Sequence, residues 1–262
     1  MGENTVAGVV IEVDGAVLRI TLDKPDQLNA VNAEMLWAVE NALSRHELDD
    51  SIRCVVLTGR GRAFCSGADL GGGAAVDAKP TPATLDAANA VVAAIRRFRA
   101  PVIAVTRGPV AGVGVSLALV CDLVISADDA FFLLAFTKIG LMPDGGATAL
   151  VAASIGRARA MQMALLAPRI SAAQALEWGL IAFTAPADEL DTTAEGVIQQ
   201  IVAGPALAFR ETKFAVNEAT LGGLEDALRY ERAGQARLIR SEDFAEGTTA
   251  FREKRAANFT GR

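Results

Sequence analysis

Hydrophobic and polar positions alternate near the start of the chain and then change to helical spacing. In "VVIEVDGAVLRITLD" (residues 9–23) apolar residues alternate with polar ones on both sides of Asp14-Gly15, a dipeptide typical of two-residue hairpin turns. In "NAVNAEMLWAVENALSRHELDD" (29–50) apolar side chains recur at spacings of three and four, and Asn32 is placed to cap a helix. The pattern therefore predicts an antiparallel strand pair followed by an amphipathic helix.

Short apolar strands then alternate with helical segments. "CVVLTG" (54–59), "PVIAVTRG" (101–108) and "CDLVISADD" (121–129) are apolar stretches that end in turns, and an Ala-rich helical segment from residue 88 precedes the second. This alternation implies parallel pairing and an α/β fold. Residues 71–85 are rich in Gly, Ala and Pro and predict a mobile loop. From about residue 205 only helical patterns remain, so we predict a core over 1–204 and a helical region over 205–262.

Composition narrows the class of protein. The 262 residues suit one large domain, a domain with an appendage, or a solenoid of small units. No apolar run reaches the roughly 20 residues of a membrane helix, and "MGENTVAGVV" has no export signal, so we expect no membrane partner and a cytoplasmic location. The net charge of −6 argues against nucleic acid as the main partner. Cys54, Cys65 and Cys121 lack metal or disulfide spacing and are expected to be reduced core residues.

Three glycine-containing turns are candidates for chemistry. "AFCSGADL" (63–70), "RGPVAGVGVSLALVCD" (107–122) and "GLMPDGGATAL" (140–150) each combine an apolar stretch, a turn and an expected helix start. The exposed N–H groups of a helix start can bind an anion or a developing oxyanion. The alternative is that the glycines merely permit tight turns and close packing. The turn around Gly112 and Gly114 lacks the Lys-Ser/Thr of a phosphate loop and the acidic residue of a full dinucleotide fingerprint.

Taken together, these segments resemble the enoyl-CoA hydratase/isomerase (crotonase) superfamily over essentially the whole chain. The resemblance rests on "AFCSGADL", "PVIAVTRGPVAGVGVSLALVCDLVISADDAFF", "IGLMPDGGAT", "ISAAQALEWGLI" and "FREKR". It implies a spiral of ββα units with a C-terminal helical trimerisation region, assembly as a trimer or as a hexamer built as a dimer of trimers, and an acyl-CoA thioester as substrate. Coenzyme A would enter as part of the substrate, and no separate cofactor or metal is expected.

The resemblance also assigns roles to individual residues. The backbone N–H groups of Ala68 and Val113 would form an oxyanion hole for the thioester, in which one donor is typically worth about 10²–10³ in rate. The substrate or its CoA moiety would be bound by residues along the chain, the last two of them from the same or a neighbouring subunit: Lys24, Ala63, Gly67, Asp69, Leu70, Gly112, Gly114, Phe136, Phe251 and Lys254. Ordinary solvated charge is an equal alternative for the two lysines.

The sequence departs from the hydratases of this superfamily at both of their catalytic glutamates, where it has Ser116 and Phe136. Hydration needs a positioned acid–base pair, so efficient hydratase activity is not expected. Asp144 in "MPDGG" remains, at a position where some isomerases of the superfamily carry their acid–base aspartate. Desolvation in an apolar pocket would raise its pKa and make it a better base. The competing interpretation is that Asp144 caps the following helix.

We therefore predict a Δ3,Δ2-enoyl-CoA isomerase in which Asp144 moves the proton. A hydratase, a CoA-thioester hydrolase or dehalogenase, a silent acyl-CoA-binding protein and a dinucleotide-binding oxidoreductase remain as alternatives. Other candidate residues are assigned structural roles. His46 is expected at the surface, Ser116 in helix packing, and Glu177 and Trp178 in a helix and its C-terminal turn.

Overall fold

The computed structural model describes residues 4–70 and 82–262. The strands are short and mostly apolar, and they run as β1 (Asn4–Val6), β2 (Val9–Asp14), β3 (Val17–Leu22), β4 (Cys54–Gly59), β5 (Val102–Thr106), β6 (Pro109–Ala111), β7 (Leu123–Ala127), β8 (Phe131–Leu133), β9 (Ile170–Ser171) and β10 (Phe183–Ala185). The helices are α1 (Ala33–His46), α2 (Ala83–Arg97), α3 (Val113–Leu119), α4 (Ala147–Leu166), α5 (Ala172–Trp178), α6 (Leu190–Ala203), α7 (Ala206–Leu221), α8 (Leu224–Leu238) and α9 (Glu242–Glu253), with short 3₁₀ turns η1 (Pro25–Gln27) and η2 (Ala135–Ile139).

Seven strands form the main sheet in the order β1-β2-β3-β4-β5-β7-β10. The first three strands pair antiparallel, and from β3 onward every neighbouring pair is parallel. A second sheet has the order β6-β8-β9. The α/β class predicted from the alternation of strands and helices is confirmed.

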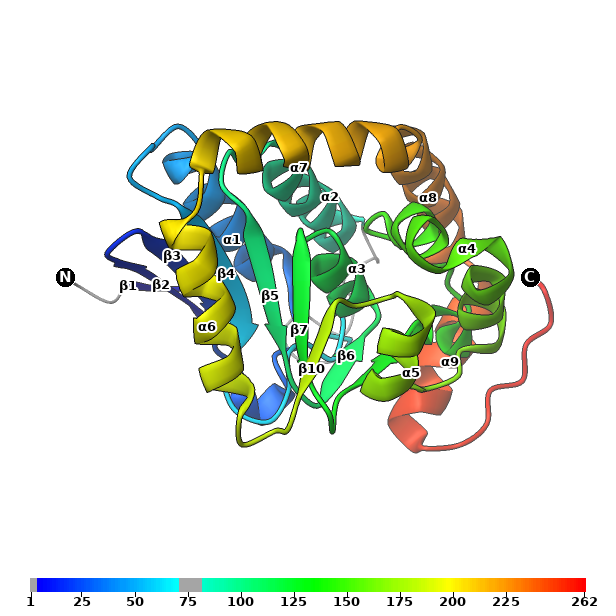
Figure 1. Cartoon of the computed structure of the whole chain (residues 1–262). Helices are drawn as coiled ribbons and strands as arrows, with labels where there is room; N and C mark the ends of the chain where they lie inside the picture. The colour runs from blue at the N-terminus through cyan, green and yellow to red at the C-terminus, as the bar shows by residue number, and fades with distance from the viewer. Residues whose placement is uncertain (1–3, 71–81) are drawn as a thin grey trace.

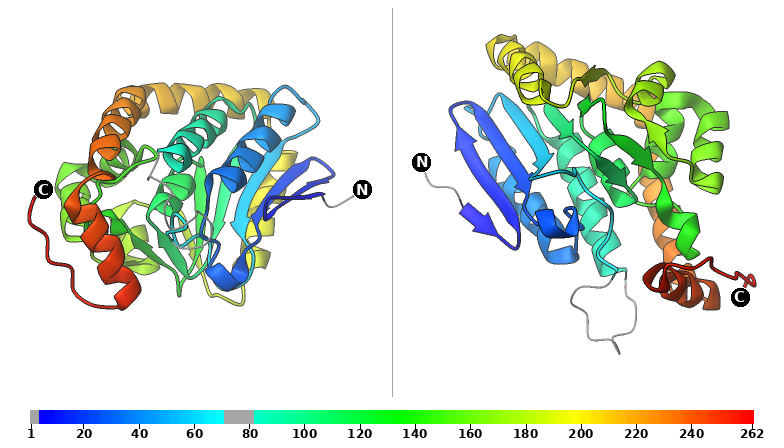
Figure 2. Two further views of the ribbon diagram at one scale, coloured as in Figure 1. Left: turned by 180° about the vertical axis from the view of Figure 1, so that it is seen from behind. Right: turned by 90° about the horizontal axis from the view of Figure 1, so that it is seen from below.

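Helices cover both faces of the main sheet (Figures 1 and 2). Alternate residues of the strands point to opposite faces, so each face has its own apolar cluster. Val55 and Leu57 of β4 pack in the cluster that includes α1, α2 and α3, whereas Val56 packs with Leu190 and Ile198 of α6 on the other face. Burial on both faces explains why the strand sequences are continuously apolar.

The first helix is stabilised as its sequence predicts. The Asn32 side chain accepts a hydrogen bond of 3.0 Å from the backbone N–H of Met35, which is the N-cap geometry.

Cys54, Cys65 and Cys121 are buried and free, and burial raises the pKa of each thiol, to about 12 for the first two. The three cysteines are therefore free thiols in the core, as predicted.

Three local predictions need correction. The hairpin turn is Gly15-Ala16, one residue later than expected, because Asp14 still pairs with Val17 in the ladder. No helix opens at Ala68, which instead forms an isolated parallel bridge with Val31. The predicted loop at 71–85 falls mainly on 71–81, outside the described residues, while α2 already includes 83–85.

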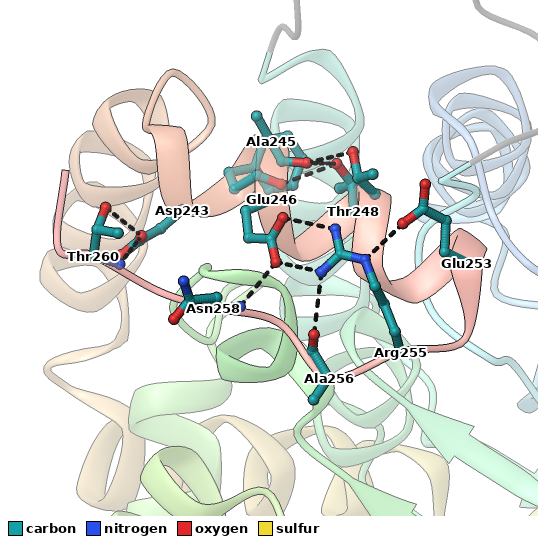
Figure 3. A network of polar contacts seen from close by, with 11 residues as sticks. Asp243, Ala245, Glu246, Thr248, Glu253, Arg255, Ala256, Asn258 and Thr260 are labelled. Atoms are coloured by element: carbon teal, nitrogen blue, oxygen red, sulfur yellow. Dashed lines mark hydrogen bonds and ion pairs between the residues drawn. The ribbon is translucent and has the colours of Figure 1, made fainter.

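The C-terminal part of the chain is helical, as predicted, and it packs closely against the core. Helix α7 lies across the ends of the main-sheet strands, packs on α2 and α4, and continues into α8 beside α4 (Figure 1). The buried Lys213 of α7 pairs with Asp122 at 2.9 Å and donates to the carbonyl of Ile95. Beyond α9, the chain turns back along that helix, where Arg255 and the N–H of Asn258 bind Glu246 (Figure 3).

Large apolar side chains are exposed on several helices. Among them are Met161, Leu165 and Leu166 in the half of α4 that follows a kink at Gly156, and Leu207 on α7. No helix among the described residues is both long and apolar enough to cross a bilayer.

Candidate active site

Two glycine-containing turns meet in the structure. One contains Gly67 and follows Phe64, and the other contains Gly112 and follows β6. Gly67 has φ +110° and Gly112 has φ +54°, values that side-chain-bearing residues rarely adopt. A Cβ on Gly112 would lie 3.4 Å from the Cα of Gly67, so the two backbones touch. A Cβ on Gly114 would lie 2.7 Å from the carbonyl oxygen of Cys65. These glycines are required by close backbone approach.

This contact places the two predicted donors in one region. The bridge to Val31 uses the carbonyl of Gly67 and the N–H of Asp69, so the N–H of Ala68 points to the other side. Val113 is the first residue of α3, and the N–H of the preceding Gly112 donates to Leu133. Among the described residues, the N–H groups of Ala68 and Val113 have no backbone acceptor.

Asp144 lies in the turn that follows η2 and precedes α4. The adjoining Gly145 packs on α3, since a Cβ there would lie 3.0 Å from the Cβ of Ser116 and 3.4 Å from Cγ2 of Val113. The hydroxyl of Ser116 donates to the backbone carbonyl of Asp144 at 2.6 Å. Ser116 thus does more than pack a helix, because it ties the Asp144 turn to the same helix that presents the Val113 N–H group.

Asp144 does not cap α4. The N-cap residue is Gly146, and the side chain that binds the helix start belongs to Glu231 of α8. Glu231 accepts from the N–H of Gly146 at 2.7 Å, and from the N–H and hydroxyl of Thr148 at 2.9 and 2.5 Å. The capping interpretation of Asp144 is therefore wrong, because a residue 87 positions later in the sequence occupies the helix end.

The Asp144 carboxyl is bound by a second residue of α8. Gln235 donates from Nε2 to Oδ2 of Asp144 at 2.7 Å and to the carbonyl of Met142 at 3.0 Å. Sequence reasoning missed both Glu231 and Gln235. A signal was present, because they continue the apolar stripe of Leu224 and Leu228 at helical spacing, and polar residues in such a stripe need a buried partner.

The surroundings of Asp144 raise its pKa to about 7. Desolvation is the main cause, the hydrogen bond from Gln235 opposes it, and the nearby Glu231 carboxylate adds to it. Glu231 is fully buried, and desolvation raises its pKa too, against the hydrogen bonds from Thr148 and Gly146. A carboxyl with a pKa near 7 can both accept and return a proton at neutral pH.

The other residues proposed for the substrate are more dispersed. Phe136 is buried in η2, and the carbonyl of buried Ala63 accepts from Asn29 at 2.8 Å. The aliphatic chain of Lys24 packs on Gly8, where a Cβ would lie 2.9 Å from Cε of Lys24. Asp69 and Leu70 are partly exposed and lie directly after Ala68, at the end of the first described range.

Phe251 and Lys254 lie at the end of α9, and both are exposed. Among the hydrogen bonds and ion pairs of the described residues, none joins Lys254 to the turns at Gly67 and Gly112. The structure of one chain therefore brings Ala68, Val113 and Asp144 together, but leaves the two C-terminal residues separate.

The residues that the sequence analysis assigned to structural roles rather than to the active site have ordinary structural surroundings. His46, at the end of α1, lies 3.6 Å from Asp49. Trp178 closes α5 and stacks against Arg159 at 4.9 Å. In the described part of the chain, no three His, Cys, Asp or Glu side chains gather as a metal site requires.

The fold and site define an α/β protein in which the half-buried Asp144 carboxyl lies near two backbone N–H groups that have no backbone acceptor among the described residues. A family model described as "Enoyl-CoA hydratase/isomerase" matches residues 12–262, and the chain belongs to that family. It is 41% identical to a probable enoyl-CoA hydratase of Rhodobacter capsulatus, covering 96% of this chain and 97% of the relative. It is 38% identical to the 1,2-epoxyphenylacetyl-CoA isomerase of Escherichia coli, covering 97% and 98%. The crystal structure of an enoyl-CoA hydratase from Mycobacterium avium subsp. paratuberculosis superposes with a TM-score of 0.92 at 46% identity, covering 98% of this chain and all of that one.

Proposed function

We propose that this member of the family is an acyl-CoA isomerase that moves a double bond from the Δ3 to the Δ2 position. The observation that carries the proposal is a single carboxyl, Asp144, with a pKa near 7 beside the first turn of α3. Ser116 and Phe136 stand where the superfamily's hydratases are expected to carry glutamates, so no acid–base pair is present at those positions. Moving a double bond needs one group that takes and returns the same proton, and one carboxyl is enough for that.

In the proposed reaction, ionised Asp144 removes a proton from C2 of a 3-enoyl thioester. The electron pair of that C–H bond becomes part of a dienolate, whose negative charge collects on the thioester oxygen. The N–H groups of Ala68 and Val113 donate to this oxygen, with each donor worth on the order of 10²–10³ in rate. Protonated Asp144 then returns the proton to C4, which leaves the double bond between C2 and C3 and restores the carboxylate.

Hydratase activity is the second candidate, because the Rhodobacter relative carries that name. The isomerase name of the Escherichia coli relative supports the first. Asp144 alone would have to activate water and also deliver a proton to carbon, so we expect hydration to be slow. Thioester hydrolysis, dehalogenation and silent acyl-CoA binding remain outcomes of the product assay described below.

For the CoA portion we propose Lys24, Ala63, Asp69 and Leu70 from one subunit. Phe251 and Lys254 would come from a second copy in a homotrimer or a hexamer. This is supported by their exposure at the end of α9 and by the exposed apolar side chains of α4 and α7. A chain that works on a CoA thioester needs no further cofactor, and we propose that it acts in the cytoplasm.

The test is to incubate the protein separately with 3-enoyl-CoA and 2-enoyl-CoA and to identify the products. We expect 2-enoyl-CoA from the first substrate and little 3-hydroxyacyl-CoA from the second. Asp144→Asn is expected to lower isomerisation by several orders of magnitude while CoA-thioester binding is retained. Isomerisation by the Asn variant at the parental rate would exclude Asp144 as the base, and binding of thioesters without turnover by either protein would favour the binding-protein alternative.

A further inference from the structure

Helix α8 contributes two buried polar residues to the Asp144 region. Glu231 has none of its surface exposed and Gln235 has 3%. They are one helical turn apart and face the same side, toward the start of α4 and the turn before it. Burial of such groups is costly unless each polar atom has a defined partner, so these partners show what the residues do.

Glu231 occupies a position that Asp144 could otherwise take. The start of a helix attracts a carboxylate through its free N–H groups and the positive end of its dipole. Asp144 precedes α4 by three residues, but the N–H groups of Gly146 and Thr148 already donate to Glu231. A carboxylate held by such donors would have a low pKa and would be a weak base. With the helix start occupied, Asp144 is free of that role.

Gln235 fixes the orientation of Asp144. Its Oε1 accepts from the N–H of Met142 at 3.4 Å, so its Nε2 must face the carbonyl of Met142 and Oδ2 of Asp144. The close approach depends on Gly234, where a Cβ would lie 2.2 Å from Sδ of Met142. Among the described residues, Oδ1 of Asp144 has no hydrogen bond. Because an amide does not titrate, Gln235 holds one oxygen without competing for the proton.

We infer that Glu231 and Gln235 are positioning residues for Asp144: Glu231 binds the start of α4 in its place, and Gln235 holds Oδ2 so that Oδ1 carries the proton. This inference rests on the proposed acid–base role of Asp144. The groups that interact with Asp144 are the neutral Ser116 on α3 and Gln235 on α8, together with the Glu231 carboxylate on α8.

The two positioning residues are expected to act on Asp144 in opposite directions. Gln235 stabilises the carboxylate, so Gln235→Met should raise the pKa of Asp144. Glu231 repels the carboxylate, so Glu231→Gln should lower that pKa while its Oε1 still accepts from the helix start. A loss of general stability would not produce shifts of opposite sign.

The experiment measures the Asp144 titration directly, by the ¹³C carboxyl signal that disappears in Asp144→Asn, and in parallel the pH dependence of kcat on 3-enoyl-CoA. For Gln235→Met we expect both midpoints to move up by about one pH unit, with kcat at neutral pH down about fivefold and KM changed less than about twofold. For Glu231→Gln we expect both midpoints to move down by about half a unit. Matched controls are Gln200→Met on α6 and Glu225→Gln on α8, both exposed, which should leave the midpoints unchanged.

Each result decides the inference. Unchanged midpoints in Gln235→Met, or shifts of the same sign in both variants, would overturn it. If Glu231→Gln does not fold, Gln235→Glu provides a second comparison: a carboxyl next to Asp144 should move the Asp144 midpoint up, and an unchanged midpoint would again overturn the inference. Because the ¹³C titration needs no turnover, a protein without isomerase activity would refute the proposed function and still show whether α8 controls Asp144.

Discussion

Replacing Asp144 by Asn should stabilise the protein in a pH-dependent manner. The folded protein holds the pKa of Asp144 at about 7, against 3.8 for an unperturbed aspartate. Between these two pH values the folded chain keeps the proton and the unfolded chain has lost it, so the free energy of unfolding of the parent falls as pH rises. The Asn side chain has no such dependence, and it can still accept the hydrogen bond from Gln235.

The magnitude follows from the shift. About three pKa units at about 1.4 kcal/mol each give roughly 4 kcal/mol at high pH, and partial exposure of Asp144 reduces this to on the order of 2–4 kcal/mol. The gain should accumulate as pH rises from about 4 to about 7, between the pKa of Asp144 in the unfolded and in the folded protein, and should be constant above that range.

Urea unfolding of both proteins at about pH 5 and about pH 8, at one fixed protein concentration, measures the effect. Asp188→Asn, at an exposed position, is the control and should show no comparable change between the two pH values. If Asp144 were instead a helix cap, its pKa would be lowered, and it would be ionised in both the folded and the unfolded protein from about pH 5 to about pH 8. An Asn variant whose stability relative to the parent is the same at the two pH values would therefore refute our assignment.

Three further predictions address the donors, the assembly and the core. Gly114→Val should abolish activity, because a Cβ at 114 would lie 2.7 Å from the Cys65 carbonyl oxygen and would move the N–H group of Val113. Val113→Ala should cost little activity. Equal losses of activity in the two folded variants would implicate the Val113 side chain. Light scattering should show a trimer or hexamer, and a stable monomer at micromolar concentration would contradict the proposed assembly. Lys213→Met should lower the free energy of unfolding by about 3 kcal/mol, because it leaves the Asp122 carboxylate without its ion-pair partner. Denaturant titration measures this change. An unchanged free energy of unfolding would show that Asp122 is protonated or solvated.

The predicted division of the chain into a core over 1–204 and a helical region over 205–262 crosses the surroundings of Asp144. The second region is helical, but its α8 holds the start of α4 and the Asp144 carboxyl. Removing 205–262 would therefore leave the Gly146 and Thr148 N–H groups without the Glu231 carboxylate, in addition to any effect on assembly. Loss of activity in such a truncation would not by itself demonstrate that oligomers are needed.

Local patterns in the sequence determined much of the fold. Alternation predicted the β2–β3 hairpin, helical spacing after Asn32 predicted α1, and the apolar run 54–59 coincides with β4. These features depend on neighbours within a few residues, so they can be read without the tertiary structure. Where a distant partner competes, local reading fails, as at Ala68, which pairs with Val31 instead of beginning a helix.

The candidate site was only partly predictable. The resemblance to the family located Ala68, Val113 and Asp144, and the structure places them in one region. Whether Asp144 caps α4 could not be decided from "MPDGG", because Asp is equally suited to a helix start and to proton transfer. The answer lies in Glu231, 87 residues away, whose carboxylate takes the helix start and whose charge acts on Asp144. Burial and through-space charge depend on which residues fold against each other, so the state of Asp144 is set by the tertiary structure alone.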